Sequence, residues 1–405
     1  MASIHPFRAL RPTPERAADV SSVPYDVVST EEARQLAANN PLSFLRVTRS
    51  EIDLPAGTDP YSSDVYARAR SNFDELRRQA PLVVEEAPSL YFYRLRMGTH
   101  EQTGIAGCFS VDEYENDVIK KHERTRRDKE DDRTRHIVEL RAQTGVVFLT
   151  YKAEHGVDAI EQRVTSEVPL YDFTAADGVR HTIWRAGGEA VRGLEQAFAA
   201  IPALYIADGH HRAASAARAR AELKARGDAP EADTFIAVAF PDNQMQVLPY
   251  NRTVKDLAGL SEDQFLESLG RVVGVARGSA SPSRKGEVSM YLGSAWYTLD
   301  FTRVTPEDDS RASSLDVALL QRNVLEKLLK IGDIRSDKRI DFVGGARGTA
   351  ALEKAVDSGK AAVAFSMFPV TLDDLMVISD AGGIMPPKST WFEPKLRDGL
   401  LIHTI

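Results

Sequence analysis

The sequence contains a single cysteine, Cys108, among 405 residues. One cysteine excludes an internal disulfide framework and a zinc site built from several thiolates, and it is what a reducing cytoplasm permits. The residues around Cys108 are apolar and strand-like, so its thiol is predicted to be buried and inert. Disulfide-stapled folds are therefore excluded.

Long apolar runs and an excess of positive charge are also missing. No stretch of eighteen apolar residues occurs, and the first fifteen residues have no apolar core of the signal-peptide kind. We therefore expect a cytoplasmic protein without a membrane partner. Asp and Glu outnumber Lys and Arg by 59 to 51, which gives a formal net charge of -8. A negative field opposes binding along a polyanion, so nucleic acid is not an expected partner.

The composition is that of an ordinary folded protein. Hydrophobic residues make up 43% of the chain and charged residues 27%, close to the averages for globular domains. A chain of this length exceeds the usual size of one core, which predicts two or three lobes. The stretch 275–290 is rich in Ser, Gly, Pro and Arg and is the best candidate for a linker. We predict parts at 1–100, 101–274 and 275–405.

Strand-like and helix-like segments alternate, which predicts a mixed α/β (α+β) fold. Residues 23–28 look extended, a capping box of Ser29 and Glu32 opens a helix, and 384–395 is too proline-rich for regular structure. The segments 234–240 and 245–250 look like paired strands around a turn at 241–243. Further strands are predicted at 90–96, 103–111, 146–151, 204–207, 340–343 and 362–368 and near 290 and 296, and further helices at 129–143, 213–226, 261–269 and 317–330.

The most informative segment is the turn Asp208-Gly209-His210-His211-Arg212 between a predicted strand and a predicted helix. A helix that begins after a glycine turn presents unpaired N–H groups and the positive end of its dipole, which favour an anion. Arg212 can add a bidentate phosphate contact, and Asp208 can hold magnesium or orient a hydroxyl. The alternative is that Asp208 only caps the helix and the histidines are exposed.

A second cluster lies between Lys120 and His136, where eight Lys or Arg residues and five Asp or Glu residues make a locally basic stretch. Its cations are candidates to clamp phosphates, and Glu123 is the simplest proton acceptor for an attacking hydroxyl. The alternative is a solvated helix face held by ion pairs between residues four apart. Together the two clusters offer the cations, the metal-binding carboxylate and the base that phosphoryl transfer needs.

Three further segments are weaker candidates for a site. Tyr250-Asn251-Arg252-Thr253 follows a predicted strand, and Lys388-Ser389-Thr390 and Lys395 lie in the proline-rich C-terminal stretch. Pro24-Tyr25-Asp26 is the third. Each has a structural alternative, as a turn, as an anchor packed on the core through Trp391 and Phe392, or as plain extended chain.

Over nearly its whole length the chain resembles the bacterial family called domain of unknown function 1015. The matching stretches are PYDVVSTEEARQLAANNPLSFLRVTRSEID, IKKHERTRRDKEDDRTRH, LYIADGHHRAASA, LPYNRTV and MPPKSTWFEPK. In its central motifs this family is similar to the ParB/sulfiredoxin-like superfamily, and particularly to free serine kinases. The resemblance implies a ParB/sulfiredoxin-like core with large N- and C-terminal elaborations.

The resemblance also implies roles for individual residues. Glu123 becomes the catalytic base with His122 beside it, and Asp208 the metal or hydroxyl partner. The implied reaction is transfer of phosphate from ATP or ADP, with Mg²⁺, to free L-serine or a related hydroxy metabolite. Compared with the compact serine kinases, the 85 positions between Glu123 and Asp208 imply an insertion at about 149–200. The implied phosphate-binding residues are Gly209, His210, His211 and Arg212. From the basic segment itself, Lys121, Thr125 and Arg126 are further candidates to bind phosphate.

Other readings of the same residues stay open. A ParB-like switch would bind CTP and act on DNA, but the sequence has no helix-turn-helix signature and no basic arm. A sulfiredoxin-like role needs a cysteine in the phosphate turn, where this chain has His210 and His211. A third possibility is a kinase scaffold kept as an inactive sensor.

Overall fold

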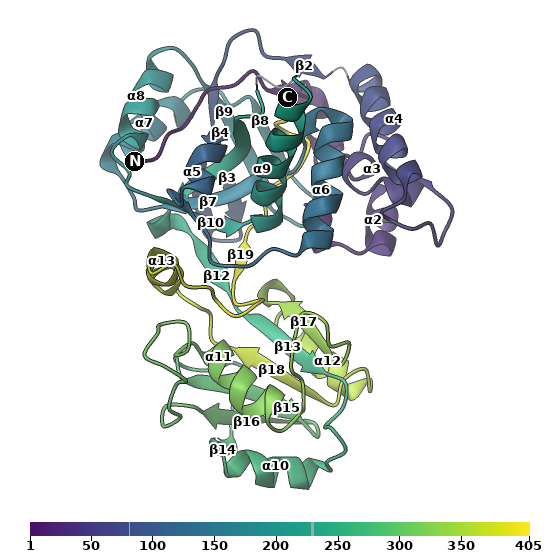
Figure 1. The fold of residues 1–405 in the computed structure, drawn as a ribbon, viewed down its shortest axis with the longest axis vertical. Helices are drawn as coiled ribbons and strands as arrows, with labels where there is room; N and C mark the ends of the chain where they lie inside the picture. The colour runs from purple at the N-terminus through teal and green to yellow at the C-terminus, as the bar shows by residue number, and fades with distance from the viewer. Residues whose placement is uncertain (81, 228–230) are drawn as a thin grey trace. The chain divides into compact units, whose positions relative to one another are not determined.

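A computed structural model describes residues 1–80, 82–227 and 231–405 (Figure 1). Contacts divide the chain into two units, unit 1 with residues 1–121, 125–245 and 394–405, and unit 2 with residues 122–124 and 246–393. Both units combine helices with β-sheet, which confirms the mixed α/β class. Among the described helices, none combines the length and the apolarity that crossing a membrane requires.

Unit 1 is built on a mixed eight-stranded sheet with the order β5-β10-β7-β11-β4-β3-β9-β8. β10 runs parallel to β5, and β11 runs parallel to β7, whereas the other neighbours are antiparallel. The central strands are buried along their length and read as continuous apolar runs. The strands are β3 Leu90–Met97, β4 His100–Ser110, β5 Ile119–Lys120, β7 Val147–Tyr151, β8 Tyr171–Thr174, β9 Arg180–Ala186, β10 Leu204–Asp208 and β11 Thr234–Pro241.

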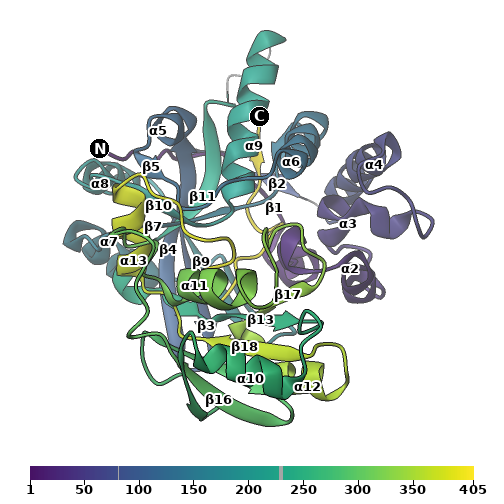
Figure 2. The same ribbon diagram turned by 60° about the horizontal axis from the view of Figure 1, so that its bottom comes forward.

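Helices cover this sheet. α6 (Arg127–Leu140) and α9 (His210–Ala225) lie side by side, as Figures 1 and 2 show. Small buried residues such as Ala213 and Ala217 let α9 lie close to the strands beneath it. α7 (His155–Thr165) and α8 (Glu189–Phe198) form a second packed pair, and α5 (Val111–Glu115) follows β4. Thus α9 is held in the core of unit 1 just where β10 ends.

The N-terminal residues of unit 1 form a helical layer. The capping box of Ser29 and Glu32 is confirmed, because each side chain accepts a hydrogen bond from the other residue's N–H. The extended segment predicted at 23–28 is wrong in its middle, where a 3₁₀ turn forms. The elements are β1 Leu10–Arg11, η1 Pro14–Arg16, α1 Ala17–Val20, η2 Tyr25–Val27, α2 Thr30–Ala37, α3 Leu45–Thr48, η3 Ser50–Asp53, α4 Ser63–Gln79 and β2 Val83–Val84.

The last residues of the chain return to unit 1. β20 (His403–Thr404) pairs with β6 (Ala142–Gln143), and Ile402 packs in one cluster with Leu10, Phe44 and Phe73. The backbones of Leu10 and Ile402 exchange two hydrogen bonds of 3.0 Å. The C-terminal segment therefore closes the layer that the N-terminal helices form.

Unit 2 is built on an antiparallel sheet with the order β14-β16-β15-β18-β13-β17. α11 (Asp316–Leu320) continues into the π-helical segment η5 (Gln321–Glu326), and β12 (Gln246–Leu248) pairs with β19 (Trp391–Glu393). The strands are β13 Tyr250–Val254, β14 Gly274–Arg277, β15 Glu287–Leu292, β16 Ala295–Asp300, β17 Ile340–Gly344 and β18 Val363–Met367, and the remaining helices are α10 Glu262–Gly270, η6 Gly345–Arg347, α12 Ala350–Asp357 and α13 Leu372–Asp380.

Two predicted elements are corrected. The strands at 234–240 and 245–250 are not a hairpin, because β11 pairs with β4 and β7 whereas β12 pairs with β19. The turn between them forms the 3₁₀ segment η4 (Asp242–Gln244). The C-terminal stretch 384–395 does contain a strand, β19, because its prolines flank Trp391–Glu393 rather than interrupt it.

The units differ from the three-part division made from the sequence, which stays a prediction about domains. The chain passes from unit 1 to unit 2 after Met245, at the start of β12. The low-complexity stretch 275–290 lies within unit 2, between β14 and β15 of one sheet. A Ser- and Gly-rich composition therefore marks a connection inside a sheet here.

Candidate functional site

The turn after β10 has the conformation that its glycine predicts. Gly209 precedes α9 with φ of 95° and ψ of 29°, a left-handed conformation that residues with a side chain rarely adopt. A Cβ atom at this position would lie 3.3 Å from Cδ of Arg212 and 3.4 Å from the Cα of Val147. The predicted order of strand, glycine turn and helix is confirmed. Gly209 provides no side-chain cap for α9, and the first N–H groups of an α-helix have no acceptor within the helix.

Asp208 ends β10 and is held as a carboxylate. Nζ of Lys395 donates to Oδ2 of Asp208 at 2.9 Å. Burial alone would raise the pKa of Asp208, but the nearby positive charges of Lys395 and Arg212 outweigh it and lower the pKa below its usual range. The side chain of Asp208 is 28% exposed. Asp208 is thus an ionised group that remains partly open to solvent.

Arg212 points into the protein. Its side chain is 5% exposed, and its Nη2 donates to both carboxylate oxygens of Asp26 at 2.6 and 2.7 Å. Its Nη1 donates to the carbonyl oxygen of Val146 at 2.9 Å. Burial opposes its charge, but Asp26, Asp208 and Asp398 together raise the pKa of Arg212 above its usual value. The guanidinium therefore ties the turn to η2, and its predicted phosphate contact stays a prediction.

A buried carboxyl group lies behind this ion pair. Asp398 is 1% exposed, and its Oδ2 has no hydrogen-bond partner in the described part of the chain. Burial raises the pKa of Asp398 to about 7, because the stabilising charge of Arg212 is partly offset by Asp26. Tyr25 completes the cluster, with the guanidinium of Arg133 4.3 Å from the centre of its ring. The turn thus rests on a network of charges in which Arg212 and Asp398 are buried and Asp26 is partly exposed.

The two histidines of the turn differ in their surroundings. His210 is buried, at 6% exposure. Nε2 of His211 accepts a hydrogen bond of 3.0 Å from the backbone N–H of Arg126, the residue that precedes α6. Because Nε2 is the acceptor, a neutral His211 carries its proton on Nδ1. His211 therefore joins the first turns of α6 and α9.

The side chains of the basic segment find partners close by in the sequence. Nζ of Lys121 lies 2.6 Å from Asp117 and donates to the carbonyl oxygen of Tyr114 at 2.8 Å. The guanidinium of Arg126 binds Asp128, and the hydroxyl of Thr125 donates to Glu130. Of these pairs, Lys121 with Asp117 has the four-residue spacing of the alternative reading, and the other two do not. The phosphate contacts expected of Lys121, Thr125 and Arg126 stay predictions.

His122 and Glu123 fall in unit 2. The carbonyl oxygen of His122 accepts a hydrogen bond of 2.8 Å from the N–H of Met385. Glu123 lines a cavity of about 300 Å³ within unit 2. The other lining residues are Arg124, Gln321, Glu326, Gly332, Asp333, Ile334, Arg335, Ile384, Met385, Pro386 and Pro387. The two halves of the predicted transfer site therefore belong to different units, and their joint action stays a proposal.

Sequence reasoning ranked some partners of the turn too low and missed one. Asp26 and Lys395 were weak candidates, yet they bind Arg212 and Asp208 across 186 and 187 positions of the chain. Asp398 was missed because nothing in the local pattern of Arg397-Asp398-Gly399 differs from an ordinary surface turn. A single sequence carries no signal for pairs at such separations.

Comparison with known proteins adds a family. The profile of the family described as Protein of unknown function (DUF1015) matches residues 4–318. A search of curated proteins found no match.

Solved structures give distant likenesses. SbnI with a C-terminal truncation, from Staphylococcus aureus, is 12% identical with a TM-score of 0.40, over 74% of this chain and 87% of that one. A conserved hypothetical protein from Pyrococcus furiosus is 14% identical with a TM-score of 0.36, over 74% and 95%. A mutant free serine kinase in complex with AMP is 13% identical with a TM-score of 0.37, over 73% and 91%. At such scores the residues themselves must carry any functional argument.

Proposed function

The chain belongs to the DUF1015 family, whose function is unknown, and we propose that it is a small-molecule kinase that uses ATP or ADP. The observation that carries the proposal is the ionised Asp208 at the open start of α9. Its acceptor is the hydroxyl of free L-serine or a related metabolite. We also propose that the core of unit 1 is of the ParB/sulfiredoxin-like kind.

The start of α9 suits the phosphates of a nucleotide. The first turn of a sixteen-residue helix without a side-chain cap offers backbone N–H donors and the positive end of the helix dipole. Nζ of Lys395, 2.9 Å from Asp208, adds a full positive charge beside this turn. In this proposal Gly209, His210 and His211 contact phosphate oxygens, and Arg212 positions the turn through Asp26.

The donor set also fits Mg²⁺. This ion is usually bound by one or two carboxylates together with water and substrate phosphates. Asp208 is ionised, and its side chain is 28% exposed. When bound, Mg²⁺ would neutralise charge on the transferred phosphoryl group. Asp208 is the residue that would hold it.

Glu123 is the proposed base. The cavity that it lines in unit 2 is large enough for a small hydroxy compound. The carboxylate of Glu123 takes the proton of the acceptor hydroxyl while the hydroxyl oxygen bonds to the terminal phosphorus. The bond from that phosphorus to the leaving nucleotide breaks, which releases ADP from ATP or AMP from ADP.

Phosphorus NMR tests the proposal directly. The protein is incubated with magnesium and ATP, ADP or CTP, with and without a panel of hydroxy amino acids. We expect a new phosphomonoester signal that needs both an adenine nucleotide and an acceptor. Preference for CTP with no acceptor-dependent turnover would favour the ParB-like switch. Neither binding nor turnover with any nucleotide would overturn the kinase proposal.

Two variants separate the roles of the site residues. We expect Glu123→Gln to reduce transfer at least about a hundredfold, the scale of general base catalysis, while nucleotide affinity is nearly intact. We expect Arg212→Ala to weaken nucleotide binding, because the turn loses its tie to Asp26. Glu115→Gln, which changes a half-exposed partner of Arg220, is the matched control. The opposite pattern would mean that the two roles are exchanged.

A further inference from the structure

Unit 2 buries a guanidinium group that no carboxylate neutralises. Arg252 lies on β13 and is 1% exposed. Its Nη1 donates to the carbonyl oxygen of Tyr250, its Nη2 donates to that of Lys388 at 3.1 Å, and its Nε has no hydrogen-bond partner. The remaining neighbour is the ring of Phe342, whose centre lies 5.6 Å from the guanidinium. Two carbonyl dipoles and a ring leave a whole charge uncompensated.

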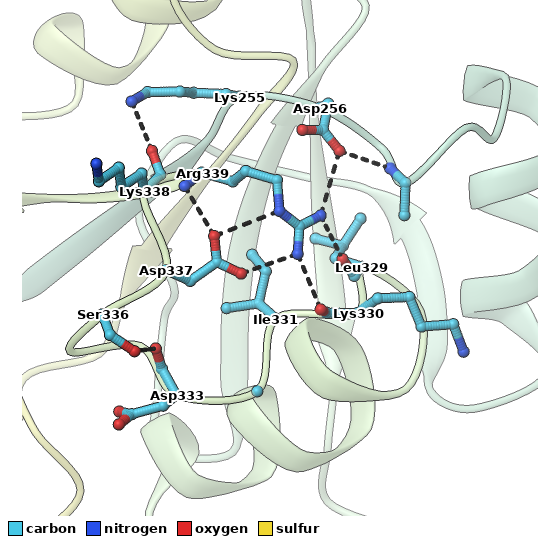
Figure 3. Close-up of polar contacts among 12 residues, drawn as sticks. Lys255, Asp256, Leu329, Lys330, Ile331, Asp333, Ser336, Asp337, Lys338 and Arg339 are labelled. Atoms are coloured by element: carbon cyan, nitrogen blue, oxygen red, sulfur yellow. Dashed lines mark hydrogen bonds and ion pairs between the residues drawn. The ribbon is translucent and has the colours of Figure 1, made fainter.

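Other arginines of this protein have carboxylate partners that neutralise their charge. Of the arginines that the structure describes as buried, Arg212 binds Asp26 and Arg397 binds Asp177. On the surface of unit 2, Arg339 donates to two carboxylates, those of Asp337 and Asp256, and to two carbonyl oxygens, as Figure 3 shows. Arg252 is more buried than any of these and has no acidic partner among the described residues.

An uncompensated buried charge is costly. Removing an ion from water costs several kcal/mol even after relaxation of the protein, and the cost is offset only by a close opposite charge. Burial lowers the pKa of Arg252 to about 10, so the group still carries its charge at neutral pH. A bound anion would supply the opposite charge that the described residues do not.

The guanidinium lies at the wall of a cavity. A small cavity of about 20 Å³ is lined by Arg252 together with Tyr250, Lys285, Asp316 and Ser389. It joins two segments that the sequence singled out separately, Tyr250–Thr253 and Lys388–Thr390, because Nη2 of Arg252 binds the backbone of Lys388. The remaining lining residues are Leu315, Val317, Met367, Phe368, Pro369, Val370 and Asp374.

The charged residues that line the cavity are Arg252, Lys285, Asp316 and Asp374. Nζ of Lys285 lies 2.9 Å from Asp374, and Arg311 also binds Asp374, whose own charge is therefore satisfied. Asp316 accepts hydrogen bonds of 2.9 and 3.1 Å from the N–H of Gly286. Among the described residues, Arg252 is therefore the cation of this cavity that binds no carboxylate.

We propose that this cavity binds a compact oxyanion, a carboxylate or a phosphate group, on the guanidinium of Arg252. A planar guanidinium donates two parallel hydrogen bonds to either group, and Nε supplies a donor that has no acceptor among the described residues. The site lies wholly within unit 2 and does not depend on the kinase proposal.

Thermal unfolding of the full-length protein tests the site. Sodium phosphate and sodium acetate are added in separate titrations, with sodium chloride of equal ionic strength as the control. Comparing the two titrations distinguishes a phosphate ligand from a carboxylate ligand. We expect one of them to raise the Tm of the wild type in a saturable way. Arg252→Met should abolish that shift. Arg277→Met is the matched control, because Arg277 lies on the same sheet with its guanidinium 4.5 Å from the ring centre of Tyr297, but is exposed.

The same variants separate a binding role from a structural one. Without added anion, we expect Arg252→Met to unfold at the wild-type temperature or above it, because the uncompensated charge is gone. Arg252→Lys keeps the positive charge but loses the paired N–H donors of the guanidinium. We therefore expect about tenfold weaker anion binding, measured by titration calorimetry. Gly209→Ala, which changes the turn of unit 1, should keep the Arg252-dependent shift.

Two results would overturn the site. One is a wild type whose Tm responds to phosphate and acetate no more than to chloride. The other is an anion response that Arg252→Met and Arg252→Lys leave unchanged. Failure of the kinase assay alone would leave the anion response in place, so the two proposals fail separately.

Discussion

At the scale of single residues, the start of α9 depends on Arg212 and its carboxylate partner. Arg212 is nearly fully buried, so an Asp26→Ala variant leaves its Nη2 without its main acceptor. Hydrogen bonds to charged groups contribute about 1.5–3 kcal/mol, and we expect a loss of that size in urea unfolding. Asp19→Ala is the control, because its ion pair with Arg16 is half exposed on both sides and should contribute less than about 1 kcal/mol. Equal losses for both variants would contradict the anchoring role.

Asp398 gives the protein a dependence on pH. Its pKa is raised from the ordinary value to about 7 in the folded state. Between these two values the folded state binds more protons than the unfolded state, so stability falls as the pH rises through this window. The slope is at most about 1.4 kcal/mol per pH unit, the value for one proton.

The Asp398→Asn variant isolates this contribution. We expect its free energy of unfolding, measured in urea between about pH 4 and pH 8, to lack the downward slope that Asp398 adds to the wild type. The buried histidines are the same in both proteins, so the difference between the two curves belongs to Asp398. Parallel curves would show that Asp398 ionises at an ordinary pH.

At the scale of elements, the turn between β10 and α9 needs glycine for two reasons. Gly209 has a positive φ, and a Cβ there would press on Arg212 and Val147. We expect Gly209→Ala to cost about 1–2 kcal/mol from the left-handed conformation and also to weaken nucleotide binding. Gly178→Ala is the matched control, because its φ is +82° with no atom within 4 Å of a new Cβ. The control variant should lose the same amount of stability, about 1–2 kcal/mol, which is the cost of the left-handed backbone conformation, and keep wild-type nucleotide affinity. Titration calorimetry would measure that affinity.

Elements with strong local signals were predictable, and their pairing was not. The helices after Ser29 and Ser261 begin at their capping residues, and the strand, glycine and helix around Gly209 follow in the expected order. The assumed hairpin of β11 and β12 failed because β12 pairs with β19, which lies far along the chain. Local propensity identifies an element, whereas its partners depend on contacts that are distant in sequence.

The same limit applied to the candidate site. The residues of the turn itself stood out, because glycine, histidine and arginine within five positions have few structural explanations. The groups that fix the charge of the turn, Asp26, Lys395 and Asp398, come from the two ends of the chain. Their importance follows from burial and distance, which no pattern in one sequence encodes.

At the scale of the whole molecule, the chain leaves unit 1 after Met245 and returns to it at Pro394. The returning segment brings Lys395 and Asp398 to the turn and Ile402 to the core. Unit 1 therefore cannot be completed before the last residues of the chain are available. The proposed nucleotide site depends in the same way on both ends of the sequence.

Ile402 tests how much this closure contributes. Its side chain is fully buried, and its backbone N–H and carbonyl both bind Leu10. We expect Ile402→Ala to lower the free energy of unfolding by about 2–5 kcal/mol, as for other large-to-small changes in a core. Amide hydrogen exchange at Leu10 should quicken as well, because its N–H donates to the carbonyl oxygen of Ile402. Val168→Ala, at a side chain that is 92% exposed, should change stability by less than about 0.5 kcal/mol. If the two variants were equally stable and exchange at Leu10 were unaltered, the C-terminal segment would be an appendage rather than part of the core of unit 1.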